Sequence, residues 1–168
     1  DKAFPIAAGQ TISQPYTVAV QTMLLKVGKR DKVLEVGTGS GYQAAVLAEM
    51  GVKVYTIERQ RELYRKAQIM LADLGYRIHF FLGDGYEGQP QYGPYDGIII
   101  TAATAEVPDK LLKQLRIGGR LVVPKGERDS QVMTLYERRG EDDYEITTHG
   151  YFVFVPMLRG IANGNDRN

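Results

Sequence analysis

The chain has 168 residues, 43% of them hydrophobic and 24% charged, and its formal net charge is +1. This length fits a single domain over residues 1–168, and the balanced charge gives no global reason to expect nucleic acid or an anionic membrane as a partner. Because the chain contains no cysteine, disulfides, thiolate metal sites and cysteine nucleophiles are excluded. No run resembles a membrane span or a secretory signal, so we expect a cytoplasmic protein, and the sequence predicts no metal site.

The N-terminal residues 1–12 contain a proline and a glycine and show no sustained hydrophobic period, which predicts an extended loop. A helix is predicted to follow and to run to Val27, with Pro15 in its first turn. Its expected apolar face consists of Val18, Met23, Leu24, Leu25 and Val27. Ser13 lies where an N-cap residue would lie, and the local sequence alone favours this structural role.

The most informative stretch is a glycine-rich turn that follows the first predicted strand, residues 32–36. Three glycines alternate with small hydroxyl residues in the order Gly37, Thr38, Gly39, Ser40, Gly41, and a helix is predicted over 43–50. Alternating glycines let the backbone bend sharply and leave no Cβ between the backbone and a ligand. The turn therefore predicts a cofactor site.

Two cofactors compete for such a turn. A dinucleotide-binding turn has the pattern G-x-G-x-x-G, but here Tyr42 occupies the third glycine position and Gly41 comes one residue early. No Lys or Arg lies between Val33 and Met50 to help to hold phosphate. The pattern G-x-G-x-G after an acidic residue suits an uncharged ribose and a zwitterionic amino-acid tail, which are parts of S-adenosylmethionine. The sequence favours this cofactor and leaves a dinucleotide site and a purely structural turn as alternatives.

Strands and helices alternate through the middle of the chain. Further strands are predicted over 52–57, 77–82, 95–101 and 120–124, and helices over 60–74 and 109–115, with a turn at Gly118–Gly119. Residues 131–137 and 144–158 predict two more strands joined by a charged turn. This order predicts the α/β class, with a doubly wound, mainly parallel sheet and an antiparallel C-terminal strand region. Residues 163–168 are expected to form a disordered polar tail.

Polar residues lie at or near the ends of four predicted strands: Glu35, Glu58, Asp84 and Thr101. Each alone has a structural alternative, because strands commonly end in polar residues. Parallel strands, however, bring their carboxyl ends to one edge of the sheet, where ligands bind at the switch in strand order. Glu58 lies about twenty residues beyond the glycine turn, the separation at which a carboxylate meets ribose hydroxyls. Asp84 can accept a hydrogen bond from an amine such as that of adenine.

The sequence resembles the protein-L-isoaspartate O-methyltransferase family over nearly its whole length, from about Pro5 to Leu158. The matching stretches are G-Q-T-I-S-Q-P at 9–15, L-E-V-G-T-G-S-G-Y at 34–42, G-D-G at 83–85, P-Y-D at 94–96, T-A-A at 101–103, Q-L at 114–115 with G-G at 118–119, and F-V-P at 154–156. Many methyltransferases share the glycine turn, whereas the stretch at 9–15 is highly specific. Family members usually carry a helical segment before the equivalent of Asp1, so we expect this N-terminal segment to be missing.

The resemblance implies a Rossmann-like methyltransferase fold and transfer of the methyl group of S-adenosylmethionine to the α-carboxylate of L-isoaspartyl residues in damaged proteins or peptides. The ester then collapses to a succinimide, which starts repair, and S-adenosylhomocysteine is the product of the cofactor. A monomer that acts on isoaspartyl-containing peptides and proteins is expected. The cofactor-binding residues implied by motif position are Thr11, Ile12, Glu35, Gly37, Thr38, Gly39, Gly41, Glu58, Asp84, Gly85 and Thr101.

Ser13 falls on the serine that the family uses near the reacting carboxylate, so the resemblance implies that it is the catalytic residue and binds substrate. Residues 150–156 are expected to pair with an extended peptide as the edge of a sheet does, which assigns Phe154 and Val155 to substrate binding as well. A sulfonium is an activated electrophile and a carboxylate is ionised at neutral pH, so no strong general base is needed. Ser13 is therefore expected to orient the carboxylate and not to act as a nucleophile. Capping and this role are compatible.

Proteins of other classes remain as alternatives. The first is another S-adenosylmethionine-dependent methyltransferase, acting on a small molecule or a nucleic acid; T-A-A at 101–103 differs from the Pro-Pro-aromatic signature used for nitrogen acceptors, and the cytosine-C5 mechanism needs a cysteine. The second is a nicotinamide oxidoreductase, which Tyr42 disfavours. The third is a cofactor-binding module without catalytic activity.

Overall fold

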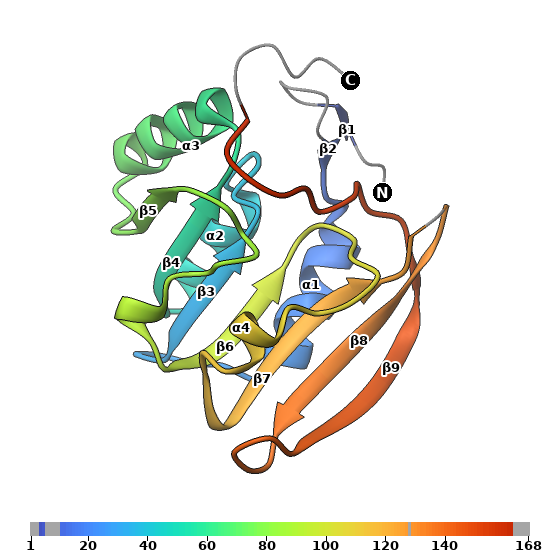
Figure 1. The fold of residues 1–168 in the computed structure, drawn as a ribbon. Coiled ribbons are helices and arrows are strands. Elements are labelled where there is room, and N and C mark those ends of the chain that lie inside the picture. Colours follow the sequence, from blue (N-terminus) through green and yellow to red (C-terminus); the bar gives the residue numbers. More distant parts are fainter. Residues whose placement is uncertain (1–3, 6–10, 128, 163–168) are drawn as a thin grey trace.

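The computed structural model describes residues 4–5, 11–127 and 129–162 of the chain (Figure 1). These residues form a sheet of seven strands in the order β5-β4-β3-β6-β7-β8-β9 and a separate antiparallel pair, β1 (Phe4–Pro5) with β2 (Thr11–Ile12). The short pair lies in the stretch that was expected to be a loop. The predicted tail at 163–168 lies outside the described residues.

The seven-stranded sheet is parallel over its first five strands and antiparallel at the end. Its strands are β3 (Lys32–Val36), β4 (Lys53–Glu58), β5 (His79–Leu82), β6 (Tyr95–Ile100), β7 (Leu115–Lys125), β8 (Gln131–Arg138) and β9 (Tyr144–Phe152). The pairs formed among β5, β4, β3, β6 and β7 are parallel, whereas β8 and β9 run antiparallel to their neighbours. The predicted fold class, including the antiparallel C-terminal region, is confirmed.

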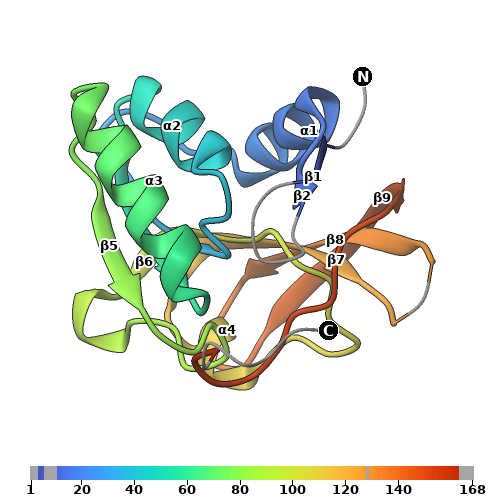
Figure 2. The same cartoon turned by 90° about the horizontal axis from the view of Figure 1, so that it is seen from above.

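Helices cover both faces of the sheet, unequally. Figure 2 shows α1 (Pro15–Leu25), α2 (Tyr42–Glu49) and α3 (Arg61–Asp73) on one face and the short α4 (Asp109–Leu112) on the other, where irregular segments and a 3-10 turn at Pro90–Tyr92 complete the cover. Residues of β3 alternate between two cores, since Val33 packs with Leu47 under α2 and Leu34 packs with Leu111 of α4. Among the described residues, none of the helices has the length and apolar character that a membrane crossing requires.

Two details of α1 differ from the sequence prediction. The N-cap is Gln14 and not Ser13, because Pro15 takes the first helical position and holds the preceding residue in an extended conformation (φ −64°, ψ 145°). Met23 was predicted to be apolar core, but 74% of it is exposed. The buried face of the helix instead combines the apolar Val18 and Leu25 with three polar residues, Thr17, Gln21 and Thr22.

The prediction was also wrong around the fifth parallel strand. The helix expected over 109–115 ends at Leu112, and β7 begins at Leu115. Gly118 and Gly119, expected to form a turn, lie within β7. There Leu115 pairs with Tyr95 and Arg120 with Gly97, so the intervening residues bulge out of the ladder.

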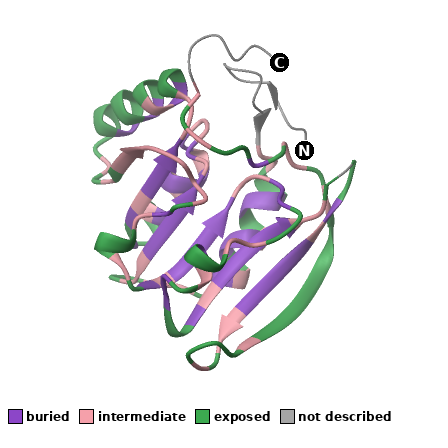
Figure 3. Ribbon diagram, in the orientation of Figure 1, coloured by how far each residue is buried: buried purple, intermediate pink, exposed green. Residues whose placement is uncertain are grey.

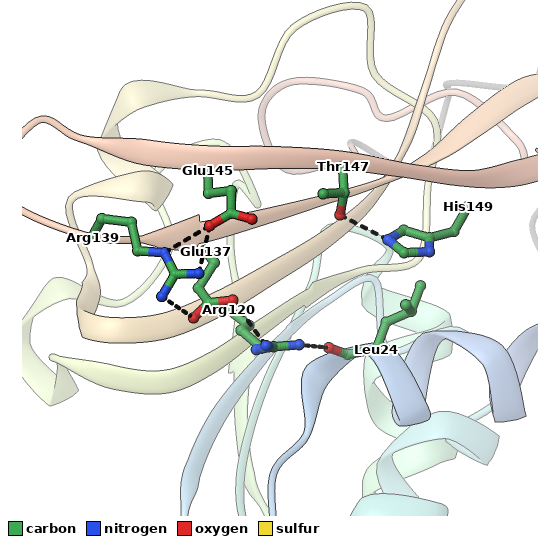
Figure 4. Close-up of polar contacts among 7 residues, drawn as sticks. All are labelled: Leu24, Arg120, Glu137, Arg139, Glu145, Thr147 and His149. Atoms are coloured by element: carbon green, nitrogen blue, oxygen red, sulfur yellow. Dashed lines mark hydrogen bonds and ion pairs between the residues drawn. The ribbon is translucent and has the colours of Figure 1, made fainter.

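The antiparallel end of the sheet is less buried than the rest. Figure 3 shows purple, buried residues along β3, β6 and β7, whereas β9 is an edge strand exposed along most of its length. Charged residues tie this end together (Figure 4): Arg120 of β7 donates to the carbonyl of Leu24 and pairs with Glu137 of β8. Arg139 pairs with both Glu137 and Glu145.

Candidate cofactor site

A cavity opens at the carboxyl ends of β3 and β6. This is the point at which the strand order reverses, because β3 pairs with β4 on one side and with β6 on the other. Ligands bind at such switch points in doubly wound sheets. The cavity is lined by residues 36–40, 42–43, 57–60, 85, 101–102 and 155–158, together with Ser13 and Val18.

The glycine turn forms one wall, and its backbone is fixed from two neighbouring strands. The Gly37 amide donates to the carbonyl of Ile57 at 2.9 Å, and the Thr101 hydroxyl donates to the Gly37 carbonyl at 2.6 Å. Gly37 has φ +98°, and a Cβ there would lie 2.6 Å from the Thr101 Oγ1. Both facts require glycine at this position.

The Glu58 carboxylate is held at the end of β4 by two backbone donors. The Gly39 amide donates to its Oε2 at 2.9 Å and the Gln60 amide donates to its Oε1 at 2.8 Å. The residue is only 6% exposed, yet it lines the cavity. Because each carboxylate oxygen can accept more than one hydrogen bond, Glu58 retains acceptor capacity for hydroxyls of a ligand.

Glu35 lies inside the protein and does not line the cavity. It is fully buried, its Oε1 accepts a hydrogen bond of 2.5 Å from the Thr56 hydroxyl, and its Oε2 has no partner among the described residues. Burial raises the pKa of Glu35 to about 8; the Thr56 bond acts in the opposite direction, and the charge of Glu58 raises the pKa further. Glu35 is therefore mainly neutral at pH 7.

Asp84 also lies outside the cavity lining, whereas Gly85 belongs to it. The amides of Tyr86 and Gly160 donate to the two carboxylate oxygens of Asp84, each at 2.9 Å. A Cβ on Gly85 would lie 2.4 Å from a methyl carbon of Val36. Asp84 therefore fixes the backbone next to the cavity, and Gly85 lets that backbone approach β3.

The predicted substrate residues lie on both sides of one wall. Ser13 and Val155 line the cavity, while Phe154 lines a neighbouring surface depression. The segment that carries Phe154 and Val155 is fixed by Ala103. The Ala103 amide donates to the Val155 carbonyl and the Ala103 carbonyl accepts from the Met157 amide, both at 2.7 Å. The side chains of Thr11 and Ile12 lie outside what the structure describes.

The structure thus places six of the predicted cofactor residues around the cavity: Gly37, Thr38, Gly39, Glu58, Gly85 and Thr101. Glu35, Gly41 and Asp84 do not belong to the lining of the cavity. Sequence reasoning missed Met157 and Leu158, for which the sequence carries no local signal. It also missed Arg59 and Gln60. Their position directly after Glu58 was a signal that could have placed them at the cavity.

The chemical groups around the cavity fit a nucleoside without phosphate. Ser13, Thr38 and Ser40 bring hydroxyl side chains to the lining and Glu58 brings a carboxylate, while apolar residues such as Ile57 and Met157 supply the rest. Arg59 is the basic residue of the lining, and its guanidinium donates to the carbonyls of Gly160 and Arg159. A carboxylate and hydroxyls suit ribose, and the apolar surface suits a purine.

The fold and this site define an α/β methyltransferase of the S-adenosylmethionine-dependent class. A solved protein-L-isoaspartate O-methyltransferase is similar with a TM-score of 0.84 and 30% identity, covering 96% of this chain and 51% of that chain. A structure from Plasmodium falciparum, a putative protein-L-isoaspartate O-methyltransferase in complex with S-adenosyl-L-homocysteine, has the same fold with a TM-score of 0.78 and 23% identity, covering 93% of this chain and 79% of that chain.

The sequence comparisons identify the family. The model of the family Protein-L-isoaspartate(D-aspartate) O-methyltransferase matches residues 1–162. Relatives named protein-L-isoaspartate O-methyltransferase are 60% identical in Christiangramia forsetii and 58% identical in Flavobacterium psychrophilum, each over 159 residues that cover 94% of this chain and 74% of the relative. The chain belongs to the protein-L-isoaspartate(D-aspartate) O-methyltransferase family.

Proposed function

We propose that this protein transfers the methyl group of S-adenosylmethionine to the α-carboxylate of L-isoaspartyl residues in damaged proteins and peptides. The observation that carries the proposal, beside the family, is that Ser13 lines the same cavity as the glycine turn and Glu58. A carboxylate at the Ser13 hydroxyl and a nucleoside on Glu58 would therefore share one space. The resulting ester collapses without the enzyme to a succinimide, which starts repair.

The cofactor is held in this proposal by the residues of the glycine turn, by Glu58 at the ribose hydroxyls and by Gly85 and Thr101. Thr11 and Ile12 are assigned to the same cofactor by motif position. None of Glu35, Gly41 and Asp84 lines the cavity. Gly41 and Asp84 contribute through the backbone that they form or hold, and Glu35 contributes through its hydrogen bond with Thr56. When bound, S-adenosylmethionine supplies a methyl group that is activated by its sulfonium.

The protein's part in catalysis is to position the carboxylate and to exclude water. The substrate carboxylate is ionised at neutral pH, so no residue has to remove a proton from it. Ser13 orients the carboxylate by donating a hydrogen bond and is not a nucleophile. Residues 155–158 contribute apolar atoms to the wall of the cavity. In this proposal they limit the access of water to the carboxylate and the cofactor.

Peptide recognition depends mainly on main-chain contacts, because the damaged residue occurs in many sequences. Phe154 and Val155 are half-buried and follow the edge strand β9, so they do not lie in the middle of the sheet. We assign substrate binding to Ser13, Phe154 and Val155, with an extended peptide along this segment. The proposal includes a monomer with a single methyltransferase domain in the cytoplasm and no role in nucleic-acid binding.

The test is methylation with tritiated S-adenosylmethionine of two peptides that differ only in one isoaspartyl or aspartyl residue. Base-labile methyl ester should form on the isoaspartyl peptide and not on its aspartyl partner. Equal labelling of both peptides would contradict the assigned substrate. Binding of S-adenosylhomocysteine without transfer to either peptide would favour the alternative, a methyltransferase that acts on a small molecule.

A further inference from the structure

A buried chain of hydrogen bonds runs from the cavity wall to a carboxyl group inside the sheet. Thr38 lines the cavity, and its Oγ1 lies 2.6 Å from the Oγ1 of Thr56. Thr56 in turn donates to the Glu35 Oε1 at 2.5 Å. Thr38 is 4% exposed, and Thr56 and Glu35 are 0% exposed. Thr56 therefore connects a cavity residue to Glu35 without lining the cavity itself.

The direction of these bonds depends on the proton of Glu35, because each hydroxyl has one proton to donate. When Glu35 is ionised, Thr56 donates to it and Thr38 donates to Thr56, so Thr38 offers only lone pairs to the cavity. When the Glu35 Oε1 carries a proton, Glu35 donates to Thr56 and Thr56 donates to Thr38. The Thr38 hydroxyl then keeps its own proton for a group in the cavity.

The surroundings of Glu35 contain little other charge. Burial is the main cause that raises the pKa of Glu35, the bond from Thr56 lowers it, and Glu58 from the adjacent strand β4 is the charged group that raises it further. The helices on this side of the sheet bury no charged residue here: α1 contributes Gln21 and Thr22 and α2 contributes Gln43. The Nε2 groups of Gln21 and Gln43 donate to the Ile100 carbonyl and to the Thr22 hydroxyl, so their donors are engaged away from Glu35. Thr56 is therefore the side chain whose hydrogen bond acts directly on Glu35.

We propose that Thr56 is a positioning residue of the cofactor site, whose hydroxyl fixes Thr38 and relays the protonation state of Glu35 to the bound cofactor. This inference rests on the proposed function, which assigns Thr38 to the cofactor. Thr56 acts through Thr38 and touches neither cofactor nor substrate. Nothing in its position in the middle of β4 would indicate this from the sequence.

The experiment compares Thr56→Val, which replaces the hydroxyl by a methyl, with Thr56→Ser, which keeps the hydroxyl. The dissociation constant of S-adenosylhomocysteine is measured by calorimetry from about pH 6 to about pH 9, on both sides of the Glu35 pKa of about 8. Thr56→Val should weaken binding about tenfold, the effect of one lost buried hydrogen bond, and should raise the KM for S-adenosylmethionine more than it lowers kcat. Thr56→Ser should bind like wild type.

The pH dependence separates the relay from simple packing. The ionisable groups of S-adenosylhomocysteine titrate in the same way with every variant. The relay is therefore read from the difference in pH dependence between the variants. Thr56→Val should lose the part of the pH dependence that reaches the ligand through Thr38, and Thr56→Ser should keep it. Thr134→Val is the matched control, because Thr134 is 3% exposed and its hydroxyl donates within β8 to the Val132 carbonyl at 2.9 Å. This control should bind S-adenosylhomocysteine like wild type.

The proposal is overturned if Thr56→Val binds within twofold of wild type with the same pH dependence, or if Thr134→Val weakens binding as much. If Thr56→Val does not fold, the pair Glu35→Gln and Thr38→Val decides: the effect of Glu35→Gln on affinity should disappear in the Thr38→Val background, and additive effects would contradict the relay. Failure of the proposed function would look different, because wild type itself would then not methylate the isoaspartyl peptide.

Discussion

The backbone amide of Gly39 donates a hydrogen bond of 2.9 Å to the Oε2 of Glu58, which joins the turn after β3 to the end of β4. The two residues lie at the carboxyl ends of adjacent parallel strands, so the same carboxylate shapes the glycine turn and faces the cavity. A change at Glu58 therefore affects the cofactor site in two ways, through a lost ligand contact and through a loosened turn.

Glu58→Gln should weaken the binding of S-adenosylhomocysteine by tenfold or more. The amide cannot accept at both ends, so one of the two backbone donors, Gly39 or Gln60, loses its acceptor, and a buried donor without a partner costs about 1–3 kcal/mol. Calorimetric titration measures the effect. Glu62→Gln is the control, since Glu62 lies four residues further on and pairs with Lys66 at the surface. Equal affinities of the two variants would contradict the role of Glu58.

Ser13→Ala should lower kcat/KM for an isoaspartyl peptide by about a hundredfold, the typical effect of a misplaced reacting group. The residual rate should remain well above the uncatalysed background, because the variant still holds both reactants in the cavity. Steady-state kinetics give the rate, and mass spectrometry of wild type during turnover gives the second readout. A trapped covalent adduct on Ser13 would refute the orienting role, and the exposed Ser130→Ala should behave like wild type.

Gly37→Ala should disrupt the turn. The backbone angle of φ +98° is unfavourable for alanine, and the added Cβ would lie 2.6 Å from the Thr101 Oγ1. We expect a loss of more than about 1 kcal/mol of stability and a large loss of cofactor affinity. Thermal unfolding with and without S-adenosylhomocysteine measures both. Gly28→Ala is the control, because a Cβ on Gly28 would meet no atom within 4 Å, and it should change neither quantity by comparison.

Glu35 should make the stability of the protein depend on pH. Its folded-state pKa of about 8 lies above the ordinary value of 4.5, so the folded state binds the proton more tightly than the unfolded state between these values. The stability that this proton provides is full below about pH 4.5 and is lost as the pH rises to about 8. Glu35→Gln does not titrate. Melting temperatures measured across this range should therefore fall less in the variant than in wild type; parallel curves would show that Glu35 has an ordinary pKa.

Glu137→Ala should destabilise the antiparallel end of the sheet by about 2 kcal/mol, because it leaves the half-buried Arg120 without its carboxylate. Figure 4 shows Glu137 between Arg120 and Arg139. Chemical denaturation measures the change. Glu145→Ala removes an exposed partner of Arg139 and should cost less than about 1 kcal/mol. If both variants lose the same stability, the burial of the Arg120 pair has no energetic consequence.

The sequence predicted the parallel part of the fold well, because its signals are local. Buried strands such as β3 and β6 are mostly apolar, and glycine at 37, 39 and 41 marks the turn between a strand and a helix. The antiparallel ending could be predicted from the alternation in residues 131–137. The bulge in β7 could not, since it depends on how Leu115 and Arg120 pair with a different strand.

The cavity was only partly predictable, for a related physical reason. Residues that follow a strand directly, such as Glu58 and Thr101, can be assigned to the ligand edge from topology alone. Whether a carboxylate faces the cavity or the interior depends on partners far away in the chain. Glu35 turns inward to Thr56, and Asp84 is engaged by Gly160, so neither orientation could be predicted from spacing.

The contact between Ala103 and residues 155–157 also constrains when the protein can become functional. These residues follow all seven strands of the large sheet along the chain, yet they complete the wall of the cavity. During synthesis the nucleoside therefore has no finished pocket until every strand has emerged and docked. The ligand can stabilise the completed fold by binding to it, but it cannot stabilise the earlier folding stages, in which the site is incomplete.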